Sequence, residues 1–294
     1  MVNTRILSEE FEYVEPKTVE EAVHYLATYN KRAKVVAGGT DLLVQMKMGK
    51  VHPDCLINIS RIPSLRYLIE GRGLRIGSLT TFREIERSQG IKKKYTALFE
   101  AARSVSSVQI KTMGTVGGNL CNASPAADSA PPLIAFGAKV KLVEGNCENA
   151  VPLEEFFIRT GETVLSPRGL LVEVEVPEIS GETGSAFLKM GRVSADLAKV
   201  SVCVAVVREG DLCLDCKIVM GSVAKTPLRT RKAEVILKGK KFGEDLAEKA
   251  SHQVSEEIQP RTRRSTAWYK REVSQVMVRN ALRLAWKRAG GEIV

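Results

Sequence analysis

The chain has 294 residues, of which 44% are hydrophobic and 27% are charged. This composition excludes a mainly disordered chain or a coiled coil and indicates a soluble globular protein with a sizeable core. The length predicts two domains, or one domain with subdivisions. The formal net charge of +10 invites a nucleic-acid hypothesis, but the basic runs at 92–94, 238–241 and 261–264 are separate and aromatic residues make up only 5%. We therefore expect solvated faces or an acidic partner, and no nucleic acid.

No targeting or membrane segment is evident in the sequence. The first residues, MVNTRILSEEFEYVEP, contain no apolar run of signal-peptide length, and no stretch approaches the roughly 18 apolar residues that cross a membrane. We expect a cytoplasmic chain without a transmembrane segment.

Predicted elements in the first half begin with a helix at 18–29, where the capping box of Thr18 and Glu21 precedes apolar residues at helical spacing. The other elements expected here are a buried strand at 34–37, strands at 55–59 and 74–78, a second capping box at Thr81 and Glu84, and a helix at 94–104.

In the second half, alternating apolar residues predict strands at 138–144 and 169–177. The polar break after Pro177, EISGETG, is the expected domain boundary. Beyond it we expect strands at 200–207 and 212–220, followed by helices at 230–237, 244–257 and 266–288.

Six cysteines are present, and only Cys213 and Cys216 form a C-x-x-C motif. The surrounding LCLDCKIVM alternates like a strand, which predicts opposite faces for two residues three positions apart. No second C-x-x-C completes a set of four ligands. We expect reduced structural thiols, with no metal and no iron–sulfur cluster in this chain.

Two glycine-rich segments carry the candidate site. In VVAGGTDLL, at 35–43, a strand runs into Gly-Gly and leaves consecutive N–H groups that can converge on phosphate oxygens. The segment GTVGGNLCNASPAAD, at 114–128, repeats the Gly-Gly after a β-branched pair. Neither segment matches the usual dinucleotide or nucleoside-triphosphate fingerprints, and a lone Gly-Gly is most often only a turn. Together they are able to clasp a long, phosphorylated ligand from two sides.

Three motifs carry a family resemblance: AGGTDLL at 37–43, TVGGNLCNASPAADSAPPL at 115–133 and FLKMGRVSADLAKV at 187–200. They resemble the signatures of the FAD-binding medium subunit of molybdenum hydroxylases, the xanthine dehydrogenase and carbon monoxide dehydrogenase family. The resemblance implies an α+β fold: a vanillyl-alcohol-oxidase-type FAD-binding domain of two α+β subdomains, then a C-terminal domain of antiparallel sheet plus helices. We place the first domain at 1–177, with subdomains at about 1–55 and 56–177, and the second at 178–294.

The resemblance also implies the cofactor contacts. The first segment would wrap the FAD pyrophosphate, the second would add pyrophosphate and ribityl contacts, Leu171 would touch the cofactor and Lys189 would approach the flavin ring. The implied cofactor-binding residues are Val35, Val36, Ala37, Gly38, Gly39, Thr40, Asp41, Leu42, Thr115, Gly117, Gly118, Asn119, Ser124, Asp128, Leu171 and Lys189. We expect noncovalent FAD, because no His, Cys or Tyr stands where a flavin linkage can be argued.

Several of these residues also have a purely structural explanation. Asp128 is able to cap the segment that follows it, and Asn119 is able to satisfy loop carbonyls. Leu171 is a core residue first, and Cys121 is a small apolar filler with no assigned catalysis.

The implied function depends on what the chain lacks as well. It has no set of cysteines spaced to hold [2Fe–2S] clusters and no room for a molybdopterin-binding domain. The clusters would therefore belong to a small partner subunit and the molybdopterin to a large one, in a dimer of heterotrimers. Electrons would pass from the iron–sulfur partner through FAD to NAD or another acceptor. The alternatives are a self-contained vanillyl-alcohol-oxidase-type flavin oxidase or dehydrogenase, and a non-enzymatic nucleotide- or nucleic-acid-binding module. The sequence does not name the substrate, for which CO, a purine, nicotinate and an aldehyde remain open.

Overall fold

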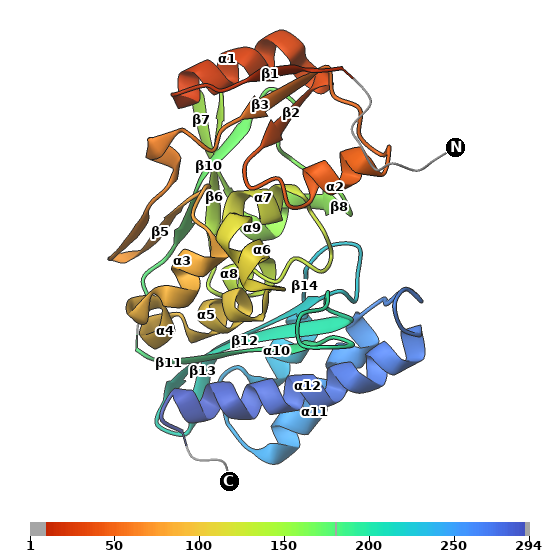
Figure 1. Ribbon diagram of the computed structural model, residues 1–294. Helices are drawn as coiled ribbons and strands as arrows, with labels where there is room; N and C mark the ends of the chain where they lie inside the picture. Colours follow the sequence, from red (N-terminus) through yellow and green to blue (C-terminus); the bar gives the residue numbers. More distant parts are fainter. Residues whose placement is uncertain (1–9, 180, 292–294) are drawn as a thin grey trace.

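The structure is a computed structural model that describes residues 10–179 and 181–291. Most of the segment considered for a signal sequence, residues 1–9, lies outside the described residues. Figure 1 shows three sheets along the long axis of the molecule, with the N-terminal elements at one end and the C-terminal helices at the other. No helix in the described ranges is long and apolar enough to span a membrane.

The first sheet is small and parallel, with the strand order β1-β3-β2. Helix α1 covers it, and the side chain of its N-cap residue, Thr18, accepts a hydrogen bond from the Glu21 amide. Strand β2 ends in the first glycine segment, which leads into α2. The bounds are β1 Glu12–Val14, α1 Val19–Tyr29, η1 Asn30–Arg32, β2 Ala33–Val36, α2 Leu42–Lys47 and β3 Cys55–Asn58. The helix and both strands predicted here are confirmed.

The second sheet is antiparallel, with the order β4-β5-β10-β6-β7. Its strands are β4 Leu68–Gly71, β5 Gly73–Gly77, β6 Lys139–Glu144, β7 Cys147–Pro152 and β10 Leu170–Val176. The sequence pattern predicted β5, β6 and β10. It missed β4 and β7, which are mostly exposed edge strands held by hairpin pairing, so they carry no apolar pattern.

Short helices precede and connect the strands of this sheet; some of them contact it, and others contact the third sheet, described next. They are η2 Pro63–Leu65, α3 Phe82–Arg87, α4 Gln89–Lys94, α5 Thr96–Ser104, α6 Val108–Met113, α7 Val116–Cys121, α8 Ala130–Ala135 and α9 Leu153–Phe156, followed by the hairpin of β8 Phe157–Arg159 and β9 Glu162–Thr163. The capping box at Thr81 and Glu84 opens α3 as predicted. The second glycine segment was expected to be a loop, but α7 runs through it because the Thr115 hydroxyl caps the helix by accepting from the Gly118 amide at 3.1 Å.

The third sheet is antiparallel and lies between two layers of helices. It contains β11 Glu182–Met190, β12 Val200–Glu209, β13 Leu212–Gly221 and β14 Leu228–Arg229, with β15 Lys240–Lys241 beside β13. Val202 and Val204 face the helices α10 Arg231–Leu237, α11 Glu244–Glu257 and α12 Ala267–Arg288. Cys203 and Ala205 face the core that includes α5 and α8. This C-terminal antiparallel sheet with helices confirms the predicted α+β fold.

The prediction that Cys213 and Cys216 lie on opposite faces of their strand is wrong. The register of β12 and β13 shifts between the pairs Val207–Asp215 and Arg208–Cys213, so Leu214 is an extra residue in a β-bulge. The bulge restores both cysteines to one face, where they lie buried in the same core cluster. Both are free thiols, and within the described ranges no three His, Cys, Asp or Glu side chains gather as a metal site.

Candidate functional site

The first glycine segment forms a turn whose backbone N–H groups have no hydrogen-bond partner among the described residues. Gly39 has a φ of +69°, in the left-handed region that glycine adopts without strain. Within the described part of the chain, no oxygen accepts a hydrogen bond from the amides of Gly38, Gly39 or Thr40. Asp41 is the N-cap residue of α2, and Leu42 is its first residue. Consecutive free amides at such a turn suit an anion.

This turn is in contact with the second glycine segment. A Cβ atom on Gly38 would lie 1.8 Å from the carbonyl oxygen of Met113, so the two backbones approach as closely as only glycine allows. Farther along, Gln45 Nε2 of α2 donates to Asn122 Oδ1, just after α7, at 3.1 Å. The structure therefore brings together two glycine segments that are far apart in the sequence.

The two glycines of the second segment have different surroundings. Gly117 is packed tightly: its amide donates to the carbonyl oxygen of Ser78 at 2.9 Å, and an added Cβ would lie 2.7 Å from Ser78 Cβ. Gly118 is exposed, has no positive φ, and an added Cβ would meet only Thr115 Oγ1, at 3.0 Å. Gly117 is therefore needed for packing, whereas Gly118 leaves a bare surface at the start of α7.

Asn119 and Ser124 already bond to their own segment. Asn119 Oδ1 accepts from the hydroxyl of Ser129 at 2.6 Å, and Ser124 Oγ accepts from the amide of Ala126 at 3.2 Å. Both residues are partly exposed. The printed contact of Asn119 is thus between its amide oxygen and a hydroxyl, and not between its amide NH2 group and a loop carbonyl as the alternative supposed.

Asp128 forms a buried ion pair with Lys189. The distance from Lys189 Nζ to Asp128 Oδ2 is 2.6 Å, and the two side chains are only 8% and 7% exposed. Lys189 also donates to the carbonyl oxygen of Ser104 at 3.0 Å. The alternative role of Asp128 as a helix cap does not appear, because the N-cap residue of α8 is Ser129 and no side chain caps this helix.

The Asp128 carboxylate is electrostatically unusual. Burial raises its pKa to about 6, although the charge and the hydrogen bond of Lys189 act in the opposite direction. Its second oxygen, Oδ1, is buried without a hydrogen-bond partner. An orphaned carboxylate oxygen is able to accept a hydrogen bond from a ligand hydroxyl.

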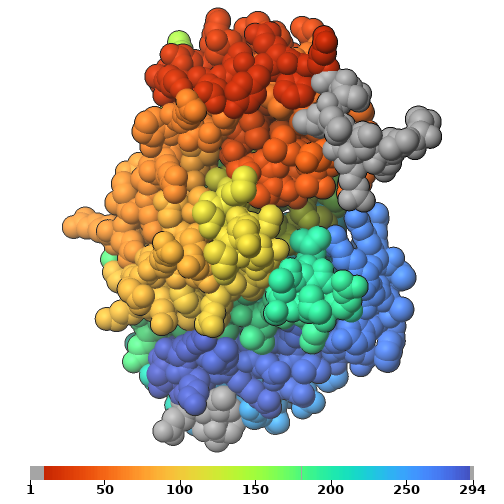
Figure 2. All heavy atoms as spheres, viewed as in Figure 1, coloured from red at the N-terminus to blue at the C-terminus, as the bar shows by residue number. Residues whose placement is uncertain are grey.

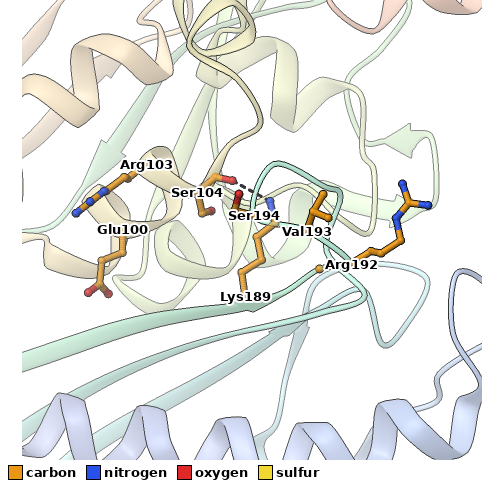
Figure 3. A pocket seen from close by; sticks show the side chains of 8 residues that line it. Glu100, Arg103, Ser104, Lys189, Arg192, Val193 and Ser194 are labelled. Carbon is orange, nitrogen blue, oxygen red and sulfur yellow. Dashed lines mark hydrogen bonds between the residues drawn. The ribbon is translucent and has the colours of Figure 1, made fainter.

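A hollow of about 560 Å³ opens beside Lys189. Figure 3 shows the Lys189 side chain reaching toward Ser104 at the end of α5, with Arg192 on the loop that follows β11. The sequence does not point to Ser104 or to this end of α5. No local motif marks them, because their contact with Lys189 is made across the fold.

The surroundings of Leu171 and Cys121 indicate packing roles for both side chains. Leu171 is 2% exposed in β10 and belongs to the core of the second sheet. Burial raises the pKa of the Cys121 thiol to about 12, so this thiol stays protonated near neutral pH.

These residues fit a cofactor that carries phosphates at one end and hydroxyls along its length. The free amides at Gly38 to Thr40 suit phosphate oxygens, and the orphaned Asp128 Oδ1 suits a hydroxyl. In Figure 2 the surface is hollowed between the orange segment of α2, the yellow segment of α6 and the blue-green residues after β11. The fold and site thus define a protein that binds an elongated phosphorylated cofactor.

Comparison with known proteins gives the family. The family described as "FAD binding domain in molybdopterin dehydrogenase" matches residues 9–179, and the "CO dehydrogenase flavoprotein C-terminal domain" matches residues 185–285. The chain belongs to this family of flavoprotein subunits of molybdopterin dehydrogenases, as its three motifs predicted.

Relatives are similar over nearly their whole length. The glyceraldehyde dehydrogenase medium chain of Sulfolobus acidocaldarius is 31% identical over 93% of this chain and 98% of its own. The carbon monoxide dehydrogenase medium chain of Hydrogenophaga pseudoflava is 33% identical over 95% and 98%. A solved structure of carbon monoxide dehydrogenase from H. pseudoflava, which lacks the Mo-pyranopterin moiety of its cofactor, matches with a TM-score of 0.93 and 33% identity over 96% of this chain and 99% of that one. The family match and these relatives confirm the prediction that the chain is an FAD-dependent oxidoreductase subunit.

Proposed function

We propose that the chain is the electron-transfer subunit of a multi-subunit molybdenum hydroxylase. It would take electrons from a [2Fe–2S] partner subunit and pass them from FAD to an external acceptor such as NAD. The observation that carries the proposal is the contact of the two glycine segments at Gly38 and Met113, together with the buried pair of Asp128 and Lys189. The family match supports it, and so do the relatives, which are medium chains of dehydrogenases.

The first glycine segment, residues 35–42, would hold the pyrophosphate through its free amides. In the second segment, Thr115 shapes the start of α7 and Gly118 leaves room for a ligand to approach the backbone. Residues 119, 124 and 128 would face hydroxyls, and Leu171 would contribute an apolar surface from β10. The redox chemistry belongs to the bound flavin, while the chain binds and orients it.

Lys189 would bring a positive charge to the flavin ring. Its ammonium is held in place by Asp128 Oδ2 and the carbonyl of Ser104, so its position is set before any cofactor binds. Such a fixed charge favours negative charge on the ring, which helps the ring to accept electrons. We propose that the attachment of FAD is noncovalent.

We also propose the division into an FAD-binding domain at 1–177, with subdomains at about 1–55 and 56–177, and a C-terminal domain at 178–294. The two family matches, at 9–179 and 185–285, support the outer boundary. So does the break between the end of β10 at Val176 and the start of β11 at Glu182.

The proposed partners are a large molybdopterin-binding subunit and a small [2Fe–2S] subunit, in a cytoplasmic dimer of heterotrimers. The test is purification of the chain alone and with its partners. We expect about one FAD per chain, released intact by acid or heat, and turnover of CO, purines, nicotinate or aldehydes only in the complex. Flavin that stays attached after denaturation would refute noncovalent binding, and substrate oxidation by the isolated chain would favour a self-contained oxidase.

A further inference from the structure

The second glycine segment is bonded at Pro125 to a residue of the C-terminal domain. The carbonyl oxygen of Pro125 accepts from Ser222, at 2.7 Å from its amide and at 3.4 Å from its hydroxyl. Ser222 directly follows β13 of the third sheet. Pro125 directly follows Ser124, and Asp128 comes next in the same segment; both are proposed contacts of the FAD hydroxyls. Ser222 therefore helps to fix the stretch of chain that carries these two side chains.

Ser222 has a backbone conformation that a residue with a Cβ atom rarely adopts. Its φ is +64°, in the left-handed region. Such a conformation persists where the surrounding contacts enforce it. The amide of Ser222 is bonded to Pro125, and its carbonyl oxygen accepts from Lys270 Nζ at 3.0 Å. The turn is therefore held between the second glycine segment on one side and α12 on the other.

Lys270, in the first turn of α12, is buried for the sake of this one contact. The residue is 5% exposed, and within residues 10–179 and 181–291 its ammonium pairs with no carboxylate. Lys111 and Lys189, whose side chains are also buried, each pair with a carboxylate, at 2.7 Å and 2.6 Å. Burying an ammonium group costs free energy that hydrogen bonds must offset. The carbonyl of Ser222 is the acceptor that offsets it here.

The other side of Ser124 is fixed as well. Ala123, which precedes it, has a φ of +44°, and its carbonyl oxygen accepts from the amide of Gly161 at 3.0 Å. Gly161 lies in the turn between β8 and β9. The backbone carbonyls before and after Ser124 are thus both bonded to residues outside the segment, so the direction of its side chain is set by distant parts of the chain.

We propose that Lys270 and Ser222 are positioning residues for FAD, which act through Pro125 without touching the cofactor. The inference rests on the proposed function, in which Ser124 and Asp128 face the hydroxyls of FAD. Lys189 of β11 holds the same segment at Asp128, so the C-terminal domain fixes it at two points. The affinity for FAD therefore depends on a side chain of α12, outside the domain that binds the cofactor.

The test is a titration of the flavin-free chain with FAD, with circular dichroism to verify folding. Lys270→Met leaves the Ser222 carbonyl without its donor and is expected to weaken FAD binding by about three- to tenfold, the equivalent of one hydrogen bond. The matched control is Thr230→Val. It also removes a buried side-chain donor from a carbonyl of β13, that of Ile218 at 3.2 Å, and should leave the affinity for FAD unchanged because Thr230 has no bond to the second glycine segment. An equal loss in both variants would reduce Lys270 to a structural role and overturn the proposal.

A double variant tests whether Lys270 acts through the segment that carries Ser124. Ser124→Ala should weaken FAD binding, and adding Lys270→Met should weaken it by less than the product of the two single losses. Single losses that simply multiply, or a Ser124→Ala variant without any loss, would overturn the positioning role.

The failure of this inference is distinct from the failure of the proposed function. A parent that binds FAD beside a Lys270→Met variant that binds it equally well refutes the inference alone, whereas a folded parent that does not bind FAD refutes both. Ser222→Ala, which removes only the hydroxyl bond to Pro125, gives a second test if Lys270→Met does not fold. We expect it to weaken FAD binding by about two- to threefold, and an unchanged affinity would count against the proposal.

Discussion

The ammonium of Lys189 lies 2.6 Å from Asp128 Oδ2, in a place that solvent hardly reaches. This contact joins the second glycine segment to β11, so the part of the chain that carries the proposed ribityl contact is fastened to the C-terminal sheet. Loss of one partner leaves the other as an uncompensated buried charge.

Lys189→Met is therefore expected to lower the free energy of unfolding by about 3 to 5 kcal/mol, since it leaves the Asp128 carboxylate buried and unpaired. Adding Asp128→Asn should recover much of this loss. Urea unfolding followed by circular dichroism measures both variants. Arg192→Ala, which breaks an exposed pair with Asp196, is the control and should cost no more than about 1 kcal/mol. If Lys189→Met lowers the free energy of unfolding as little as the control does, the burial argument is contradicted.

The raised pKa of Asp128 predicts that the stability of the folded chain depends on pH. Its pKa is about 6 in the folded chain and 3.8 in its ordinary state, so between these values the folded chain binds a proton that the unfolded chain does not. This carboxyl group therefore contributes stability that grows as the pH falls through about 6 and is lost as the pH rises. Relative to Asp128→Asn, the parent should gain roughly 1.4 kcal/mol between about pH 7.5 and about pH 5. Urea unfolding of both proteins at the two pH values measures this gain. If the difference in free energy of unfolding between the two proteins is the same at both pH values, Asp128 does not titrate between them.

Gly38→Ala should destabilise the chain. The added Cβ would lie 1.8 Å from the carbonyl oxygen of Met113, a backbone atom that moves only if α6 shifts. Overpacking of this kind costs about 1 to 3 kcal/mol. A thermal unfolding curve tests it, with Gly71→Ala as the control because an added Cβ there meets nothing within 4 Å. Equal melting temperatures would mean that the two glycine segments are less closely packed than the structure shows.

Gly118→Val should act on cofactor binding and leave folding intact. An added Cβ meets only the Thr115 hydroxyl, and the backbone has no positive φ, so the fold is expected to tolerate the side chain. If FAD lies over the start of α7, the valine occupies its space and the purified protein should be largely flavin-free. The measurement is a titration with FAD beside the parent, with circular dichroism to verify folding. A folded variant that binds FAD as tightly as the parent would exclude this surface as the binding place.

The thiols should react at very different rates. Cys147 is exposed, Cys121 is partly buried and the other four cysteines are buried. Because the thiol reacts as the thiolate and must be reached by the reagent, we expect one fast-reacting thiol per chain, at Cys147. An aromatic disulfide reagent measures the rate, and Cys147→Ser should abolish the fast phase. A second fast thiol would place Cys121 or the pair at Cys213 and Cys216 nearer to solvent than the structure does.

The sequence alone determined what depends on local pattern. The caps at Thr18 and Thr81, the long helix α12 and the alternating strands β5, β6, β10, β12 and β13 follow from spacings of a few residues. The three motifs also determined the family, because their order and residue types are specific.

Tertiary structure decided what depends on contacts across the fold. Leu214 became the extra residue of a bulge through the register of β12 against β13, which no local pattern shows, and so Cys213 and Cys216 share a face. Lys189 meets Asp128, and Gly38 meets Met113, because packing brings distant segments together. Whether a buried charge is paired is decided by its neighbours in space, and the sequence shows only its neighbours along the chain.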